Sequence, residues 1–358
     1  RTIHKNTSRG RLMDTSEFID NIEKAHQEMI EKAQPKSNVF DKLVTLRERG
    51  WLVKNPPPRK YLFSIEEQFE QQTGFLPEGK ACMIVSPGGC GKTFLLAHCA
   101  LAAATGTTWL HAKATRPIKV LFIAAEEDEN ELWNRFYKMA KSIGIANNPL
   151  TMNLALDNII PFPTLGLNQR LIEDKGEPRQ FYHDLKAVIE NDQDIKLVIL
   201  DPASRFMGSE TETKNSAATD WVNLIESLTL VGGKPTLLVA HHTNKTAIRP
   251  VGNDKTPDFN QTMARGASAI IDGFRWVLGL QRSEEENRQR SIFIKLLKSN
   301  YSQLGQILEF EQDYQNSGTL SFIGIVSKEH ERAKKVDKYW EEARRQGAES
   351  YNPYTTNY

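Results

Sequence analysis

Short apolar runs alternate with amphipathic stretches between residues 75 and 240. Four runs rich in β-branched and aliphatic residues are expected to form strands at residues 81–86, 119–124, 196–200 and 236–240. Helical spacing of apolar residues predicts helices at residues 91–104, 130–143, 180–191 and 220–231. Strands that alternate with helices build a mostly parallel sheet covered by helices. The pattern therefore predicts an α/β fold.

The pattern changes after residue 273. Closely spaced strands are expected at residues 274–281, 291–297, 306–311 and 320–326, with turn residues between them. Strands joined by short turns pair antiparallel. We therefore expect antiparallel C-terminal strands that extend the parallel sheet.

Both ends of the chain differ from this central region. Apolar residues recur at helical spacing from Phe18 to Met29, and three prolines at 56–58 form a stiff boundary. A charged helix is expected at residues 328–346, followed by a polar tail. These features predict a helical N-terminal extension (residues 1–55), a main α/β domain (56–327) and a C-terminal helix and tail (328–358).

Charge and composition exclude several classes of protein. The 358 residues include 46 Lys and Arg against 45 Asp and Glu, a formal net charge of +1. This balance excludes a protein that holds nucleic acid by bulk charge, so a bound polyanion must meet a local patch. The 3 cysteines have no zinc-site or disulfide-framework spacing. With no apolar run long enough for a bilayer and no signal-peptide core at residues 1–11, a cytoplasmic protein is expected.

A phosphate-binding loop is expected directly after the first predicted strand. The segment reads Ser86, Pro87, Gly88, Gly89, Cys90, Gly91, Lys92 and Thr93, and it leads into an apolar helix. It meets the P-loop pattern GxxxxGK[ST] except at its first position, where Ser86 replaces Gly. Glycines allow backbone N–H groups to converge on phosphate oxygens, and the lysine reaches the β and γ phosphates. Thr93 would offer its hydroxyl to Mg²⁺, so ATP and Mg²⁺ are the expected ligands.

Acidic residues end two of the other predicted strands. Asp201 ends the run at 196–200, where a P-loop protein needs an acid to hold the metal. Glu126 and Glu127 follow the run at 119–124. Either could be the base that takes a proton from the attacking water, or part of an acidic helix N-terminus. We expect Glu126 to be the base and Glu127 to lie on the helix cap.

The last parallel strand ends in His241 and His242. Adjacent side chains in a strand point to opposite faces, so only one of them can line the phosphate site. We expect His242 to lie beside the γ phosphate and to sense its presence.

In order and spacing, these motifs resemble a known family. The segments SPGGCGKT, AAEE, LVILDPASRF, AHHTNK, ARGASAIIDGFRW and IKLLKSNYS are similar to RecA-like ATPases of the plasmid hexameric replicative helicase (RepA) type, relatives of the DnaB-class helicases. The match extends over residues 57–302, and that family shares the Ser at the first P-loop position. The resemblance implies a RecA-like core, a ring usually of six subunits with ATP sites between neighbours, and single-stranded DNA in the central channel.

The resemblance also implies roles for individual residues. Lys92 and Thr93 would hold phosphate and Mg²⁺, Asp201 would be the metal-associated acid, Glu126 the catalytic base and His242 the sensor. A basic residue from the neighbouring subunit would act as an arginine finger. The candidates for that finger are Arg265, Arg275, Lys295 and Lys298, of which the last two lie on the late strand that position favours. A structural ion pair is the alternative for Arg275.

A long loop at residues 243–264 is the first candidate for contact with DNA. It carries Lys245, Arg249 and Lys255. The loop after Asp201, with Arg205 and Lys214, is the second candidate.

Together these features predict an ATP-hydrolysing, ring-forming DNA helicase or translocase in the replication of a plasmid or other mobile element, with replication proteins as partners. The alternative is a RecA-like regulatory or scaffold ATPase that recruits a protein partner without unwinding DNA.

Overall fold

The computed structural model describes residues 40, 43–66, 72–242, 259, 268–284, 290–301, 306–313 and 318–326. The chain divides into two compact units, Arg1–Pro58 and Arg59–Tyr358. In the first unit, helix α2 (Leu46–Arg49) starts after Thr45, whose hydroxyl accepts a hydrogen bond from the Glu48 N–H, and it ends at Gly50 with φ 67°. The helices expected at residues 18–29 and 328–346 lie outside the described residues.

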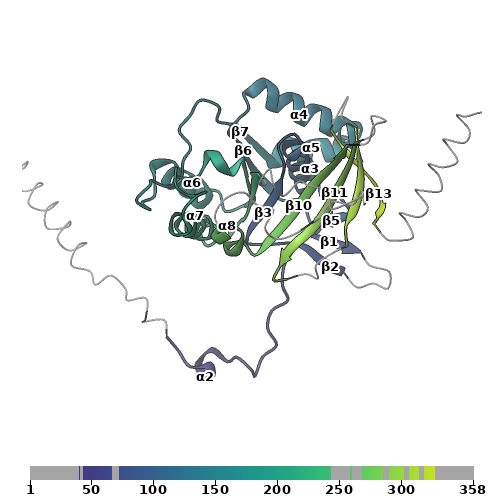
Figure 1. Ribbon diagram of the computed structural model, residues 1–358. Coiled ribbons are helices and arrows are strands. Elements are labelled where there is room, and N and C mark those ends of the chain that lie inside the picture. The colour runs from purple at the N-terminus through teal and green to yellow at the C-terminus, as the bar shows by residue number, and fades with distance from the viewer. Residues whose placement is uncertain are drawn as a thin grey trace, which may run out of the picture. The chain divides into compact units, whose positions relative to one another are not determined.

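A nine-stranded sheet forms the centre of the second unit (Figure 1). Its order is β13-β12-β11-β10-β3-β9-β8-β6-β7. The strands are β3 (Ala81–Ser86), β6 (Lys119–Ala124), β7 (Ile159–Pro163), β8 (Ile195–Asp201), β9 (Thr236–His242), β10 (Trp276–Glu284), β11 (Arg290–Ser299), β12 (Leu308–Gln312) and β13 (Leu320–Ile325). Pairing is parallel from β10 through β3 to β7, and antiparallel from β10 to β13. The predicted α/β fold with antiparallel C-terminal strands is confirmed.

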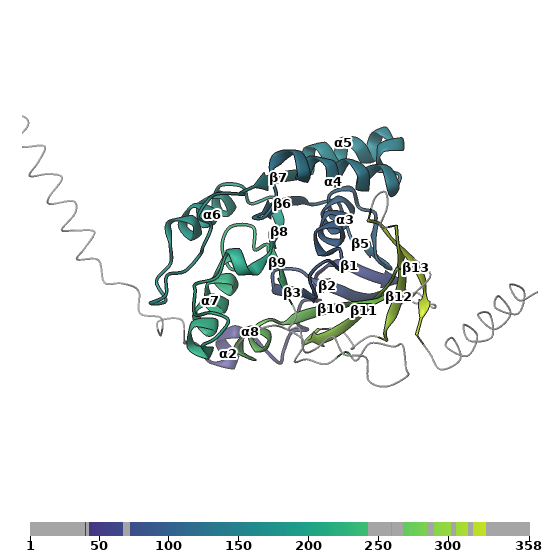
Figure 2. The ribbon, with the colours of Figure 1, turned by 45° about the horizontal axis from the view of Figure 1, so that its top comes forward.

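Helices cover both faces of this sheet. They are α3 (Lys92–Thr105), α4 (Glu129–Ser142), α5 (Pro149–Asn158), α6 (Gln180–Asn191), α7 (Asn215–Leu228) and α8 (Ser268–Gly273), with short 3₁₀ turns η2 (Ile145–Asn147) and η3 (Ala203–Arg205). Figures 1 and 2 show α3, α4 and α5 on one side of the sheet and α6, α7 and α8 on the other. In the described segments, no helix has the length and apolar character needed to cross a bilayer.

The central strands are buried on both faces because their side chains alternate between two cores. On β3, Cys82 and Ile84 join the cluster under α3, whereas Met83 and Val85 join the cluster under α7. Apolar side chains at every position of a strand are typical of a parallel sheet with helices on both sides. This is why a continuous apolar run, rather than an alternating one, marks these strands in the sequence.

The helix expected at residues 220–231 is instead α7, which begins at Asn215 and ends at Leu228. Its first turn is made of small and polar residues that carry no strong apolar periodicity. Ala218 in this turn is nevertheless fully buried. The pattern of large apolar residues therefore places the start of α7 too late, because the first buried residue of the helix is a small one.

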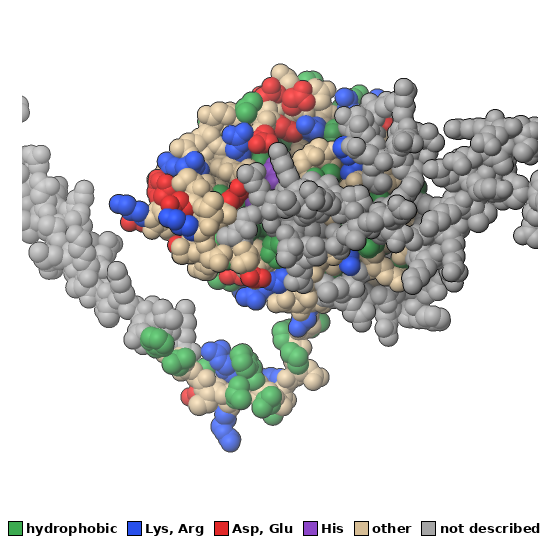
Figure 3. Space-filling model, viewed as in Figure 1, with side chains coloured by type: hydrophobic (Ala, Val, Ile, Leu, Met, Phe, Trp, Pro, Cys, Tyr) green, Lys and Arg blue, Asp and Glu red, His purple; other side chains and the backbone are tan. Residues whose placement is uncertain are grey.

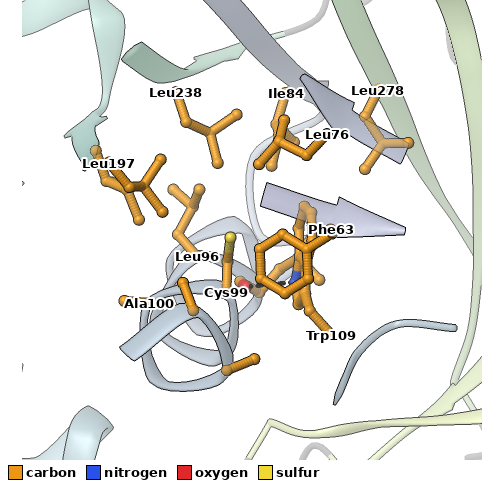
Figure 4. Packing of buried hydrophobic residues seen from close by; sticks show 14 of the residues in the cluster. Phe63, Leu76, Ile84, Leu96, Cys99, Ala100, Trp109, Leu197, Leu238 and Leu278 are labelled. Atoms are coloured by element: carbon orange, nitrogen blue, oxygen red, sulfur yellow. Dashed lines mark hydrogen bonds between the residues drawn. The ribbon is translucent and has the colours of Figure 1, made fainter. Parts of the chain in front are cut away.

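A second, four-stranded sheet was not expected from the sequence. Its order is β2-β1-β5-β4, formed by β1 (Tyr61–Glu66), β2 (Gln72–Pro77), β4 (Thr108–Trp109) and β5 (Ala112–Ala114). Trp109 packs its ring 5.4 Å from that of Phe63, and its indole N–H donates to the Leu95 carbonyl at 3.1 Å (Figure 4). The α/β unit therefore begins at β1, before the first strand of the nine-stranded sheet, and β4 and β5 are too short to show a period.

Replacing Trp109 by Ala should destabilise the protein strongly. The ring is fully buried and joins the four-stranded sheet to α3, so its removal leaves a large cavity and breaks the hydrogen bond to the Leu95 carbonyl. We expect a loss of about 3–5 kcal/mol in the free energy of unfolding, measured by denaturant titration. Trp133→Ala on α4 is the matched control, because that side chain is 69 % exposed. Equal losses from the two variants would contradict the packing described here.

Candidate active site

The loop between β3 and α3 takes the conformation of a phosphate-binding loop. Gly89 and Gly91 have φ values of 74° and 79°, in the left-handed region where a side chain would strain the backbone. Gly91 is the N-cap of α3, and no side chain caps the helix there. The first N–H groups of α3 and the helix dipole therefore face the loop, an arrangement that favours anions.

Lys92 lies at the centre of the site and is only 7 % exposed. Its Nζ is 3.1 Å from the carbonyl and from the hydroxyl oxygen of Ser86, and 3.2 Å from the carbonyl of Pro87. Burial lowers the pKa of Lys92, while the nearby carboxylate of Asp201 raises it. The Ser86 hydroxyl thus contacts the lysine directly, which gives a physical use to the residue that departs from the general P-loop pattern.

Thr93 and Asp201 bring two oxygen ligands together. The Thr93 hydroxyl donates to Asp201 Oδ2 at 2.7 Å, and Asp201 ends β8 with 6 % exposure. Burial raises the pKa of Asp201, and the hydrogen bond from Thr93 and the charge of Lys92 lower it. Mg²⁺ is usually held by one or two carboxylates together with substrate phosphates, so a hydroxyl and a carboxylate beside a phosphate loop fit this ion.

The two histidines at the end of β9 separate as expected. His242 pairs in register with Ser86, and its Nδ1 is 3.1 Å from Lys92 Nζ. His241, one residue earlier, is fully buried. His242 therefore lines the phosphate loop beside Lys92, and its sensor role stays a prediction.

Glu126 and Glu127 leave the end of β6 in different directions. Glu126 Oε1 is 3.0 Å from Arg205 Nε, with both side chains about half exposed. Glu127 Oε1 is 2.6 Å from Arg135 Nε in a largely buried pair. Burial raises the pKa of Glu127 to about 7 despite the opposing effect of Arg135.

The expectation that Glu127 caps the following helix is wrong. The N-cap of α4 is Asp128, whose carboxylate accepts a hydrogen bond from the Glu131 N–H at 2.9 Å. Asp is a preferred N-cap residue because its short side chain reaches the free N–H groups of the first turn. Glu127 precedes this cap and instead holds Arg135, which lies 4.7 Å from the centre of the Phe94 ring on α3.

Two of the finger candidates, Arg275 and Lys298, lie far along the strands from Lys92. Trp276, next to Arg275, pairs with Cys82 near the start of β3, and Lys298 pairs with Val277. Arg275 Nε is 3.7 Å from Glu226 Oε1, and Lys298 Nζ donates to the carbonyls of Ile271 and Asp272. Since β3 enters the phosphate loop at its other end, these cations do not reach the phosphate site of their own chain. Lys295 differs, because it pairs with Gly279, which pairs with Val85 at the phosphate-loop end of β3.

The first candidate DNA loop falls at residues 243–264, of which the structure describes only residue 259. Lys245, Arg249 and Lys255, as well as the finger candidate Arg265, lie outside the described residues. The second candidate loop follows β8. It carries Arg205 on η3 and Lys214 just before α7, with Lys214 Nζ 2.5 Å from Glu210 Oε1.

Two contacts at the site could not be expected from the sequence. Arg282 on β10 donates to the Gly89 carbonyl at 3.3 Å. A Cβ at Gly91 would collide with the side-chain amide of Gln312 on β12. Arg282 and Gln312 lie far from the P-loop in the sequence and belong to no motif. They come close to the loop because β10 and β12 belong to the same sheet as β3.

A comparison with protein families agrees with this geometry. A family model described as an AAA domain matches residues 42–247, more than half of the chain. The chain belongs to this AAA domain family. The match contains the phosphate loop, Glu126, Asp201 and His242, and it supports a nucleotide-binding P-loop ATPase. The AAA domain match ends before Arg275 and Lys298.

Proposed function

We propose that this AAA domain protein is an ATP-hydrolysing motor that assembles into a ring and moves along single-stranded DNA as a helicase or translocase. One observation carries the proposal. Two hydrogen-bonded pairs, Lys92 with His242 and Thr93 with Asp201, form one cluster at the carboxyl ends of parallel strands, where open α/β sheets bind ligands.

Different residues of this cluster would bind the phosphates and the metal ion of the nucleotide. The N–H groups of the loop and the Lys92 ammonium would bind the β and γ phosphates. Thr93 and Asp201 would hold Mg²⁺, which neutralises phosphate charge when bound. Lys92 is already held by the Ser86 and Pro87 carbonyls, so its ammonium is oriented toward the loop before phosphate binds.

Hydrolysis further needs an acceptor for the proton of the attacking water. Glu126 follows β6, a neighbour of β8, and its charge acts on both Lys92 and Asp201. We assign it as the base. His242 touches Lys92 and would report to the loop after β9 whether the γ phosphate is present.

Assembly would complete the site. Arg275 and Lys298 lie near the start of β3, remote from their own phosphate loop, so either could stabilise the transition state only in a neighbouring copy. This placement supports the ring that the helicase resemblance implies.

Single-stranded DNA is the proposed nucleic acid along which the motor would move. Acidic and basic side chains are interspersed on the described surface shown in Figure 3, in keeping with the net charge of +1. Nucleic acid would therefore be held by local cations on loops, with Lys245, Arg249 and Lys255 as the first candidates and Arg205 and Lys214 as the second. Replication proteins of a plasmid or other mobile element are the proposed partners.

Electron microscopy of the ATP-bound protein with and without single-stranded DNA tests this function, together with unwinding of a forked duplex. We expect closed rings with density in the channel when DNA is present, and strand separation that requires ATP. A protein that hydrolyses ATP but forms no ring and separates no strands would contradict the motor. A stable ATP-dependent complex with a protein partner would then favour the regulatory or scaffold ATPase.

A further inference from the structure

The exposed face of helix α4 carries aromatic and basic side chains that the proposed active site does not use. The positions on this face are Asn130, Trp133, Asn134, Tyr137, Lys138 and Lys141. We propose that the α4 face is a second contact for single-stranded nucleic acid, in which bases stack on Trp133 and Tyr137 and phosphates meet the two lysines. This inference deepens the proposed function and rests on it, because its ligand is the single-stranded DNA of that proposal.

The two aromatic side chains of the α4 face are adjacent and stand in water. Trp133 is 69 % exposed and Tyr137 is 54 % exposed. Residues four positions apart on a helix are neighbours on its surface, so the two rings lie side by side. A single exposed apolar residue is ordinary, whereas adjacent large apolar groups at a surface indicate a binding site.

The opposite side of α4 is anchored in the core. Leu132 and Met139 are buried, and the Phe136 ring lies edge-to-face against the Phe122 ring with 5.3 Å between their centres. The helix starts at its Asp128 cap and lies at the upper margin of the second unit in Figure 1. The exposed rings are thus presented by a fixed support, which lowers the entropy lost when a ligand binds.

The distribution of charge along α4 favours a polyanion over its second half. Glu129 and Glu131 lie in the first turn, whereas Lys138 and Lys141 lie near the other end and are exposed. Neither lysine has an acidic residue three or four positions away on the helix, the spacing at which helical ion pairs form. Lys141 Nζ is 5.2 Å from the centre of the Tyr137 ring. A phosphate beside a stacked base would therefore meet a cation directly next to the rings.

The mixture of side chains favours a nucleic acid over a protein partner. Aromatic rings beside a basic surface bind single strands without sequence preference, because every base has a face that can stack. Lysines donate hydrogen bonds to the phosphate oxygens of the backbone. The buried centre of a protein interface is instead depleted in charged residues, and in lysine in particular. Two lysines next to the rings therefore point to a nucleic acid.

Binding of fluorescein-labelled oligo-dT to the full chain, with Mg²⁺ and a non-hydrolysable ATP analogue, tests the α4 face. We expect Trp133→Ala to raise Kd about 5- to 100-fold, as for the loss of one stacked base, and Trp133→Phe to recover part of the affinity. The double variant Lys138→Ala/Lys141→Ala should lower the slope of log Kd against log salt by about one. Leu156→Ala on α5 is the matched control, because that side chain is also 69 % exposed but is aliphatic, and it should bind as wild type.

Four results would overturn this site. Wild-type affinity in Trp133→Ala would show that DNA binds elsewhere, and it would leave the motor intact if oligo-dT still stimulates hydrolysis. A loss of affinity that accompanies a loss of assembly, measured by light scattering, would show that α4 joins copies of the chain instead. An equal loss in Leu156→Ala would show that the rings have no special role. Wild-type protein that binds no oligo-dT would overturn both the α4 contact and the motor.

Discussion

Lys92→Ala is expected to abolish ATP turnover. In the proposed site the ammonium would bind the β and γ phosphates, and four hydrogen-bonding atoms on Ser86, Pro87 and His242 hold it beside the loop. Loss of a preorganised charge that meets developing negative charge lowers kcat by about a hundredfold or more. Phosphate release from ATP in the presence of Mg²⁺ is the measurement.

The control for this variant is Lys119→Ala. Lys119 begins β6, at the opposite end of the parallel strands, and pairs with Asp192 at 2.9 Å. It should retain wild-type turnover. Because Lys92 is buried, thermal unfolding of both variants must be compared with that of wild type. Full turnover by a folded Lys92→Ala protein would show that this loop does not bind the triphosphate.

Glu126→Gln should reduce kcat strongly while nucleotide binding persists. The amide keeps the size of the side chain but cannot accept the proton of the attacking water. General-base catalysis contributes about 10²–10⁴-fold, and we expect a loss of this order. Single-turnover hydrolysis, with binding of a fluorescent ATP analogue measured separately, distinguishes the chemical step from affinity.

Glu127→Gln provides the comparison at the adjacent position. The pKa of Glu127 is raised to about 7, near the value that suits a base at neutral pH, but its carboxylate faces Arg135 on α4. We therefore expect a smaller loss than in Glu126→Gln. If Glu127→Gln is the inactive variant, the two carboxylates have been assigned in the wrong order.

The strands of the central sheet could be predicted because each buries an unbroken apolar run. β3 and β6 have the expected bounds, and β8 and β9 differ from expectation by one or two residues at an end. The P-loop could be predicted for a similar reason. Its glycines, Lys92 and Thr93 are close in sequence, so one short pattern contains most of the site.

Contacts between distant segments could not be predicted in the same way. Arg205 and Glu126 are 79 positions apart, and only the pairing of β6 with β8 brings their loops together. Arg135 is directed to Glu127 by the start of α4, which depends on Asp128 as the cap. In the four-stranded sheet, β4 and β5 have two and three residues, too few to show any periodicity.

The most direct test of the central claim is steady-state ATP hydrolysis by the full chain, measured with Mg²⁺ and increasing amounts of oligo-dT. The account predicts hydrolysis that requires Mg²⁺, rises with oligo-dT to a plateau, and disappears in Lys92→Ala. Hydrolysis that oligo-dT leaves unchanged would contradict the DNA motor, and the absence of hydrolysis under every condition would contradict the ATPase itself.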